Sequence, residues 1–191
     1  MPGYDIIVIG ASLGGLRAMS VLLPGLPADF PLPIVLVQHR HVDPNGSLSA
    51  VLQRWSALAV EEVEDKQEIR SGRVYLAPSD YHLLVEPGSF ALSTEAPVAY
   101  ARPSIDVLFE SAASAYGERS VGVILTGAND DGSRGLLRLK QCGGLALVQE
   151  PATAECAVMP AAAIAAVRVD HILALALIAP FLVDLCRPES R

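Results

Sequence analysis

The sequence has few cysteines and no long apolar segment, and each shortage excludes a class of protein. Its three cysteines, Cys142, Cys156 and Cys186, are widely spaced and odd in number, so they predict neither a disulfide framework nor a zinc site. We expect them to be buried, reduced thiols. No apolar run approaches the roughly 20 residues that a membrane span needs, and the N-terminus lacks the basic and apolar stretches of a signal peptide. We therefore predict a cytoplasmic protein without membrane insertion.

Basic residues are also scarce. The chain has 14 lysine and arginine residues against 21 aspartate and glutamate residues, which gives a net charge of −7. This acidic balance disfavours nucleic acid or an anionic membrane as a partner and favours a protein or a small molecule. What the chain has in quantity is apolar residues, 51% of 191. That content predicts a globular protein with a sizeable core in one domain, residues 1–191.

Short runs of Val, Ile and Leu alternate with segments of helical spacing along the chain. The runs predict strands at residues 6–9, 34–37, 74–77, 121–125 and 145–148. The predicted helices are at residues 16–23, 47–55, 103–116, 133–141, 160–167 and 172–185. Between residues 73 and 93, strand-like stretches separated by turn formers predict a β-hairpin. The pattern is typical of an α/β protein: a doubly wound, mostly parallel sheet sandwiched by helices, with the β-hairpin inserted near a sheet edge.

The segment 4–15 is an apolar strand that stops at glycines, with Ser12 in the turn toward a helix. Such a turn normally binds a nucleotide phosphate, but here a serine replaces the middle glycine of that fingerprint. The next predicted strand ends in Gln38 and His39 rather than in the acidic residue that would bind a ribose. A serine and a histidine at two strand ends favour a hydrolase, with Ser12 as nucleophile and His39 as its base. A phosphate-binding or helix-capping turn is the alternative.

A third strand ends in a turn that carries two adjacent carboxylates, Asp130 and Asp131. Because the ligand crevice of a parallel α/β sheet lies at the carboxyl ends of the strands, either aspartate can reach the histidine there. It would hold the imidazole in the required tautomer and stabilise its positive charge, as in a catalytic triad. The chain order Ser, His, Asp differs from the Ser, Asp, His order of the α/β-hydrolases and argues against that fold.

Six sequence blocks resemble the catalytic domain of bacterial chemotaxis protein-glutamate methylesterases, the CheB type. They are Ile9-Gly10-Ala11-Ser12-x-Gly14-Gly15, Val37-Gln38-His39, Tyr75-Leu76-Ala77-Pro78-x-x-x-His82, Arg102-Pro103-Ser104-Ile105-Asp106-Val107-Leu108-Phe109, Gly122-Val123-Ile124-Leu125-Thr126-Gly127 with Asp131-Gly132, and Met159-Pro160. Their order and spacing match over nearly the whole chain. The resemblance implies a triad of Ser12, His39 and Asp131 that needs no metal or organic cofactor. It also implies hydrolysis of glutamyl methyl esters on chemoreceptor cytoplasmic helices, with methanol released, and deamidation of receptor glutamines.

Departures from the family pattern keep other interpretations open. Leu13 stands where the family usually has threonine, and Ala128-Asn129 replaces a methionine-glycine pair, so rate and substrate preference are in question. The backbone N–H groups of Leu13 and Ala128 are the predicted oxyanion donors. Another methylated protein is the alternative substrate of the esterase. The alternative function is a catalytically reduced binding module that docks to receptors or signalling partners. The family's N-terminal receiver domain is not encoded in this sequence, so we expect control by a separate receiver-type partner or none.

Four other residues have a structural as well as a functional interpretation. His41 is predicted at the rim of the site, with a lesser role as an alternative base. His82 matches a family position near the site but is equally well explained as a hydrogen-bonded structural histidine. Arg102 either belongs to a helix N-terminus or contacts an acidic receptor surface. His171, near the start of the last predicted helix, has no predicted role.

Overall fold

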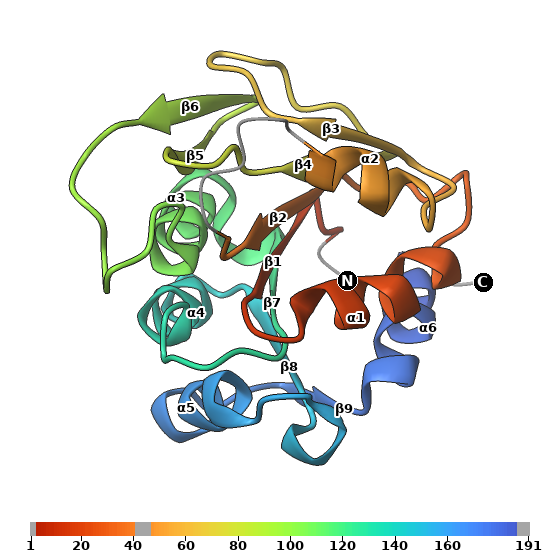
Figure 1. Ribbon diagram of the computed structural model, residues 1–191, viewed down its shortest axis with the longest axis vertical. Helices are drawn as coiled ribbons and strands as arrows, with labels where there is room; N and C mark the ends of the chain where they lie inside the picture. Colours follow the sequence, from red (N-terminus) through yellow and green to blue (C-terminus); the bar gives the residue numbers. More distant parts are fainter. Residues whose placement is uncertain (1–2, 41–46, 187–191) are drawn as a thin grey trace.

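A seven-stranded parallel sheet runs through the protein (Figure 1). The computed structural model describes residues 3–40 and 47–186. Across the sheet the strands are β3 (Ala59–Glu62), β4 (Arg73–Leu76), β2 (Ile34–Gln38), β1 (Ile6–Ala11), β7 (Ser120–Ile124), β8 (Leu145–Gln149) and β9 (His171–Leu173). Every neighbouring pair in the sheet is parallel.

Helices cover both faces of the sheet (Figure 1). One face carries α1 (Gly15–Leu22), α2 (Ser47–Gln53) and α6 (Leu175–Leu185), and the other carries α3 (Ile105–Tyr116), α4 (Ser133–Gln141) and α5 (Val158–Ala166). Single 3₁₀ turns lie at η1 (Leu23–Gly25), η2 (Gly117–Arg119) and η3 (Pro151–Thr153). This arrangement confirms the predicted doubly wound α/β sandwich.

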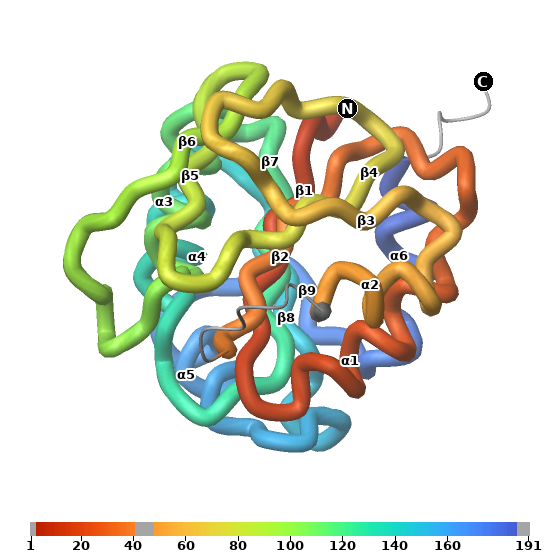
Figure 2. The backbone as a smooth tube through the Cα atoms, turned by 45° about the horizontal axis from the view of Figure 1, so that its top comes forward, coloured from red at the N-terminus to blue at the C-terminus, as the bar shows by residue number. Residues whose placement is uncertain are grey.

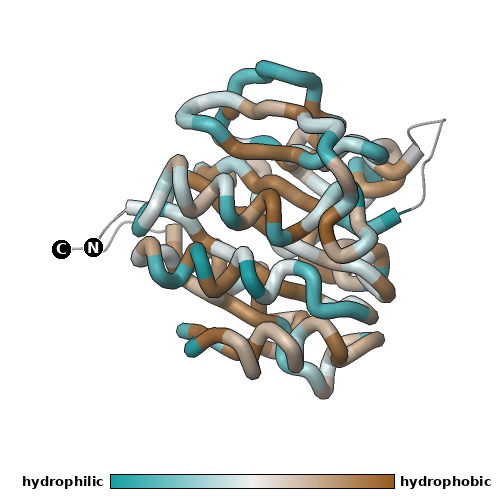
Figure 3. The backbone as a smooth tube through the Cα atoms, turned by 90° about the vertical axis from the view of Figure 1, so that its left-hand side faces the viewer, coloured by the Kyte–Doolittle hydropathy of each residue, from teal (hydrophilic) through white to brown (hydrophobic). Residues whose placement is uncertain are grey.

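The two faces of the sheet contribute to two hydrophobic cores. Along β1, Ile6 and Val8 pack among α3, α4 and α5, whereas Ile7 and Ile9 pack among α1, α2 and α6. Successive side chains of a strand point to opposite faces, so a central strand covered on both sides must be apolar at every position. Figure 3 shows these apolar strands in the interior, with more hydrophilic segments around them.

The predicted β-hairpin is present as a separate antiparallel pair, β5 (His82–Glu86) and β6 (Ser89–Ser93). Leu83, Val85 and Phe90 are buried in the same core as Leu108 of α3. The hairpin is also tied to α3 by a hydrogen bond from the backbone N–H of Val85 to the Ser111 Oγ, at 3.0 Å. It therefore covers α3 and does not extend the main sheet.

Several expected boundaries and burials are corrected by the structure. The helix expected at residues 103–116 begins at Ile105, because Ser104 is its N-cap. The helix expected at residues 172–185 begins at Leu175, because residues 171–173 form the edge strand β9. The edge strand β3 was not predicted.

The cysteines expected to be buried are free thiols that are partly exposed. Burial is still sufficient to raise the pKa of Cys186 to about 11. Within residues 3–40 and 47–186, no helix has the length and apolar character to cross a membrane.

Candidate active site

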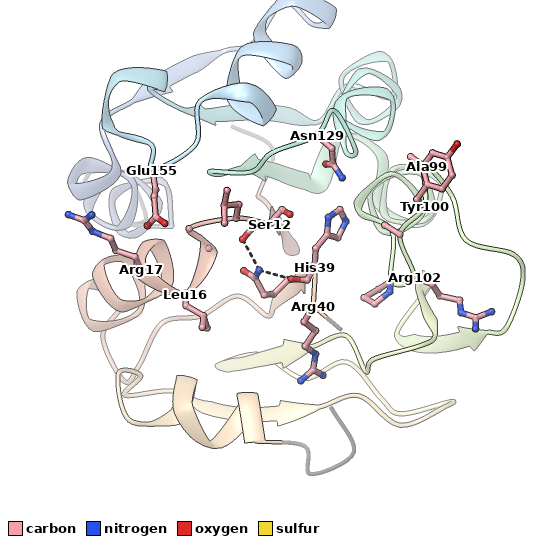
Figure 4. A pocket seen from close by; sticks show the side chains of 16 residues that line it. Ser12, Leu16, Arg17, His39, Arg40, Ala99, Tyr100, Arg102, Asn129 and Glu155 are labelled. Carbon is pink, nitrogen blue, oxygen red and sulfur yellow. Dashed lines mark hydrogen bonds between the residues drawn. The ribbon is translucent and has the colours of Figure 1, made fainter. Parts of the chain in front are cut away.

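Ser12, His39 and Asp131 lie just beyond the carboxyl ends of three adjacent strands. Ser12 follows β1, His39 follows β2, and Asp131 belongs to the turn between β7 and α4. The chain leaves β1 for a helix on one face and β7 for a helix on the other, which is the switch point where open α/β sheets bind ligands. Ser12 and His39 line a pocket of about 760 Å³ at this point (Figure 4).

The imidazole of His39 is hydrogen-bonded to the Asp131 carboxylate. His39 Nε2 donates to Asp131 Oδ2 at 2.7 Å, and Asp131 is only 1% exposed. The neighbouring Asp130 is exposed, and within the described residues its carboxylate makes no hydrogen bond to His39. His41 lies outside the described residues.

The His39–Asp131 bond determines which ring nitrogen is available to the serine. With Nε2 bound to the carboxylate, Nδ1 is the remaining ring nitrogen, and within the described residues it has no hydrogen-bond partner. No hydrogen bond joins Ser12 to His39 within the part of the chain that the structure describes. Such bonds are often long in the absence of substrate and form in the Michaelis complex.

Asp131 is held at the N-terminus of α3. Its Oδ1 accepts hydrogen bonds from Ser104 Oγ at 2.9 Å and from the N–H of Asp106 at 3.0 Å. Its Oδ2 accepts a further bond from the N–H of Ile105 at 2.7 Å. Burial raises the pKa of the Asp131 carboxyl, but the bonds from His39 and from the two backbone N–H groups outweigh burial and hold the pKa below its ordinary value. The carboxylate therefore remains charged beside His39.

Asp106, in α3, binds backbone N–H groups at the N-terminus of α4. Its Oδ1 accepts hydrogen bonds from the N–H of Gly132 at 2.9 Å and from that of Gly135 at 2.7 Å. Burial raises the pKa of Asp106, against the hydrogen bond from Gly135, and the Asp131 charge raises it further. Asp131 thus binds the N-terminus of α3, which contains Asp106, and Asp106 binds the N-terminus of α4, which follows Asp131. Sequence analysis did not predict these contacts.

Gln38 is a second residue whose role was missed. Its Nε2 donates to the backbone oxygen of Ser12 at 2.8 Å and to that of His39 at 2.9 Å. The side chain fits only because residue 15 is glycine, where an added Cβ would lie 1.8 Å from Gln38 Oε1. Gln38 therefore fixes the backbone that carries both candidate residues. The one signal in the sequence is an amide residue at the end of an otherwise apolar strand.

Thr126 anchors the Ser12 turn from the opposite side. Its Oγ1 donates to the backbone oxygen of Leu13 at 2.8 Å, and its backbone oxygen accepts from the Ser12 N–H at 2.9 Å. Gly14 has a φ of 81°, a left-handed conformation that favours glycine, and begins α1 as its N-cap. The tight turn is thus fixed before any substrate binds.

The structure supports the structural interpretation of His82 and shows the intrachain contacts of Arg102. His82 is buried, accepts a hydrogen bond from the Ser104 N–H at Nδ1 (3.3 Å), and its Nε2 lies 3.1 Å from the Ala96 oxygen. It supports the cap of α3 and does not line the pocket. Arg102 lines the pocket, but its guanidinium donates to Asp80 and to the backbone oxygens of Thr94 and Glu95. His171 lies in β9 and packs its ring against that of Phe181, with 4.4 Å between the two ring centroids.

The two predicted oxyanion donors, the N–H groups of Leu13 and Ala128, differ in their position relative to the pocket. Leu13 lines the pocket, and within residues 3–40 and 47–186 its N–H has no hydrogen-bond partner. Ala128 is exposed and does not line the pocket, although the adjacent Asn129 does. The described residues also contain no group of three His, Cys, Asp or Glu side chains placed to hold a metal ion.

A doubly wound α/β fold with a serine, a histidine and an aspartate at its switch point is the arrangement of one class of protein, the α/β serine hydrolases. Comparison with known proteins refines that class. The family model for CheB methylesterase matches residues 7–182, so the chain belongs to the CheB methylesterase family. This confirms the resemblance that the sequence blocks indicated.

Relatives and a solved structure agree with this assignment. The chain is 49% identical over 183 residues to a putative protein-glutamate methylesterase/protein-glutamine glutaminase of Leptospira interrogans, covering 95% of each chain. It is 36% identical over 172 residues to the protein-glutamate methylesterase/protein-glutamine glutaminase of Thermotoga maritima, covering 88% of this chain and 50% of the relative. The crystal structure of the Thermotoga maritima CheB methylesterase catalytic domain superposes with a TM-score of 0.88 at 35% identity, over 97% of this chain and 100% of that one.

Proposed function

We propose that the protein is a protein-glutamate methylesterase and protein-glutamine glutaminase that acts on methylated chemoreceptors. Water and a glutamyl γ-methyl ester give glutamate and methanol, and water and a glutamine side chain give glutamate and ammonia. The observation that carries the proposal is the 2.7 Å bond between His39 and buried Asp131 beside Ser12, at the switch point of a CheB methylesterase fold. The relatives' names supply the two activities.

Ser12, His39 and Asp131 are the proposed catalytic residues. Ser12 Oγ attacks the ester carbonyl while His39 Nδ1 accepts its proton, and the tetrahedral intermediate collapses to an acyl-enzyme as methanol leaves with that proton. Water then attacks the acyl-enzyme, with His39 again acting as base, and glutamate is released. Asp131 stabilises the imidazolium formed in each step, and its lowered pKa keeps the carboxylate charged for this role.

Backbone N–H groups are the proposed oxyanion donors. The N–H of Leu13 follows the nucleophile directly and lines the pocket, which supports its assignment. Ala128, on the facing turn, is the second proposed donor, and its N–H has no hydrogen-bond partner in the described part of the chain. One such donor contributes about 3 kcal/mol of transition-state stabilisation in serine hydrolases.

Two further points belong to the proposal. Residues 1–191 form a single catalytic domain, supported by the one sheet that links the N-terminal and C-terminal segments. The protein acts in the cytoplasm, where the cytoplasmic domains of the proposed receptors are found.

The test compares the wild-type protein with Ser12→Ala on a methylated receptor fragment. We expect methanol release to fall by about 10⁴-fold or more, as when other serine hydrolases lose the nucleophile. Ser20→Ala is the matched control, because the Ser20 hydroxyl only donates to a backbone oxygen within α1. Equal release by wild type and Ser12→Ala would refute the proposed nucleophile. A wild-type protein that folds, binds the fragment and releases no methanol would support the binding-module alternative instead.

A further inference from the structure

The side chain of Asn129 lines the active-site pocket and has no part in the mechanism above. Asn129 lies on the turn between β7 and α4, two residues before Asp131. In Figure 4 its amide points into the pocket, on the same side as the ring of His39. A carboxamide has both a donor and an acceptor, so a further hydrogen-bonding group is available beside the proposed base.

One end of the Asn129 amide is fixed by the backbone. Its Oδ1 accepts a hydrogen bond from the N–H of Asp131, at 3.3 Å. A backbone N–H can bond only to the oxygen of a carboxamide, so this contact determines which end of the amide is the oxygen. Nδ2 lies at the other end, and within residues 3–40 and 47–186 it has no hydrogen-bond acceptor. The free donor is therefore oriented before a substrate binds.

The turn that carries Asn129 is bound on both sides to the proposed catalytic residues. Thr126, three residues earlier, accepts a hydrogen bond from the Ser12 N–H at its backbone oxygen, at 2.9 Å. Asp131, two residues later, bonds to His39 at 2.7 Å. Figures 1 and 2 both show β2, β1 and β7, the strands that lead to these residues, next to one another. Position 129 is thus held between the segments that carry the nucleophile and its base.

Of the two backbone oxyanion donors proposed above, one lines the pocket. This is the N–H of Leu13, whereas Ala128 is exposed and is not part of the lining. The tetrahedral intermediate of acyl transfer carries negative charge on the former carbonyl oxygen, and asparagine side chains can stabilise it as backbone N–H groups do. Donors that are already oriented are the most effective, because they need no reorganisation during the reaction. The Nδ2 of Asn129 meets this requirement.

We propose that Nδ2 of Asn129 donates a hydrogen bond to the oxyanion of the tetrahedral intermediate, together with the N–H of Leu13. The inference rests on the proposed function, since the oxyanion forms when Ser12 attacks a glutamyl carbonyl. The electron pair of the C=O bond moves to the oxygen during the attack and returns when methanol leaves, so no covalent bond to Asn129 forms or breaks. A glutamine side chain gives the same oxyanion, and the donor therefore serves both activities.

The test measures kcat and KM for methanol release from a methylated receptor fragment, with kcat taken from the plateau of its pH profile. Asn129→Ala removes the donor, so we expect kcat to fall by about 10²- to 10³-fold. KM should stay within about threefold of wild type, because the oxyanion forms only after the substrate is bound. Asp130→Ala is the matched control, since Asp130 is the exposed neighbour on the same turn and does not line the pocket. Its kcat and KM should match those of wild type.

A second variant separates this role from a structural one. Asn129→Asp retains Oδ1 for the Asp131 N–H and replaces the donor by a carboxylate oxygen, which repels the oxyanion. Its kcat should fall at least as far as that of Asn129→Ala, and circular dichroism reports whether both variants are folded. If Asn129 only held the turn through Oδ1, Asn129→Asp would keep the kcat of wild type.

That result would overturn the inference, as would a kcat of Asn129→Ala within about threefold of wild type. In both cases wild type still releases methanol, so the proposed function stands. If wild type releases none, the proposed function itself fails and the inference with it.

Discussion

Asp131 binds the N-terminus of the helix that contains Asp106, and Asp106 binds the N-terminus of the helix that follows Asp131. Asp131, which precedes α4, accepts N–H groups from the start of α3, and Asp106 in α3 accepts the N–H groups of Gly132 and Gly135 at the start of α4. Both carboxylates lie where helix dipoles favour negative charge. The partner of His39 is thereby positioned by two helices at once.

Substitutions of Asp106 should separate its hydrogen bonds from its charge. Asp106→Asn keeps an Oδ1 acceptor for both glycine N–H groups and removes the repulsion from Asp131, so we expect stability to change by less than about 1 kcal/mol. Asp106→Ala leaves two buried N–H groups without their acceptor and should cost about 2–4 kcal/mol. Urea unfolding of the three proteins checks this. A large loss in Asp106→Asn would contradict the hydrogen-bond explanation and point to the charge.

Gly15→Ala should damage the site through Gln38. The new Cβ would overlap Gln38 Oε1 and displace the amide that bonds to the backbone of Ser12 and His39. We expect a stability loss of about 1–3 kcal/mol and a lower kcat. The double variant Gly15→Ala with Gln38→Ala should recover part of the lost stability, because the overlap with Gln38 is gone while the new Cβ still lies 2.9 Å from the Ala11 Cβ. It should remain impaired in kcat, because the two bonds are still absent.

The control for this experiment is Gly3→Ala, since a Cβ at residue 3 would meet no atom within 4 Å. Its stability and kcat should match those of wild type. The explanation fails if the double variant is no more stable than Gly15→Ala, as measured by thermal unfolding.

Asp131 should make stability depend on pH in the acid range. Its pKa is lowered on folding, so its contribution is fully present above the unfolded-state value of about 4 and is lost as pH falls through the lower folded-state value. The difference in unfolding free energy between wild type and Asp131→Asn should therefore shrink as pH is lowered from about 5.5 to 3. Asp130→Asn, a substitution at the neighbouring exposed position, is the matched control. A difference that stays constant with pH would mean that the Asp131 pKa is not lowered.

The strands in the interior of the sheet are the elements that the sequence predicts most clearly. The strands later found as β1, β2, β4, β7 and β8 are apolar runs, because a covered parallel strand is apolar at every position. The edge strands β3 and β9 have partly exposed patterns, and β9 has only three residues, so neither carries such a run. The sequence predicts too early a start for α6, because Ile172 and Leu173 fit a helical pattern as well as a strand.

The candidate residues were found because strand ends in a parallel sheet meet at one edge. The contacts that position them could not be found in this way. Gln38 and Ser12 are separated by 26 positions, as are Asp106 and Gly132. Which polar groups face one another over such a separation depends on helix packing and not on local pattern. The same limit applies to His82, whose bond to Ser104 is visible only in the folded chain.

The strands β2, β1 and β7 are flanked on both sides by other strands of the sheet. Opening of the edge strands β3 or β9 would therefore leave the backbone under Ser12, His39 and Asp131 fully paired. Amide hydrogens of the three inner strands should exchange with solvent only when the whole domain unfolds, while those of the two edges exchange through local fluctuations. The protein can thus lose order at its periphery while Ser12, His39 and Asp131 keep their relative positions.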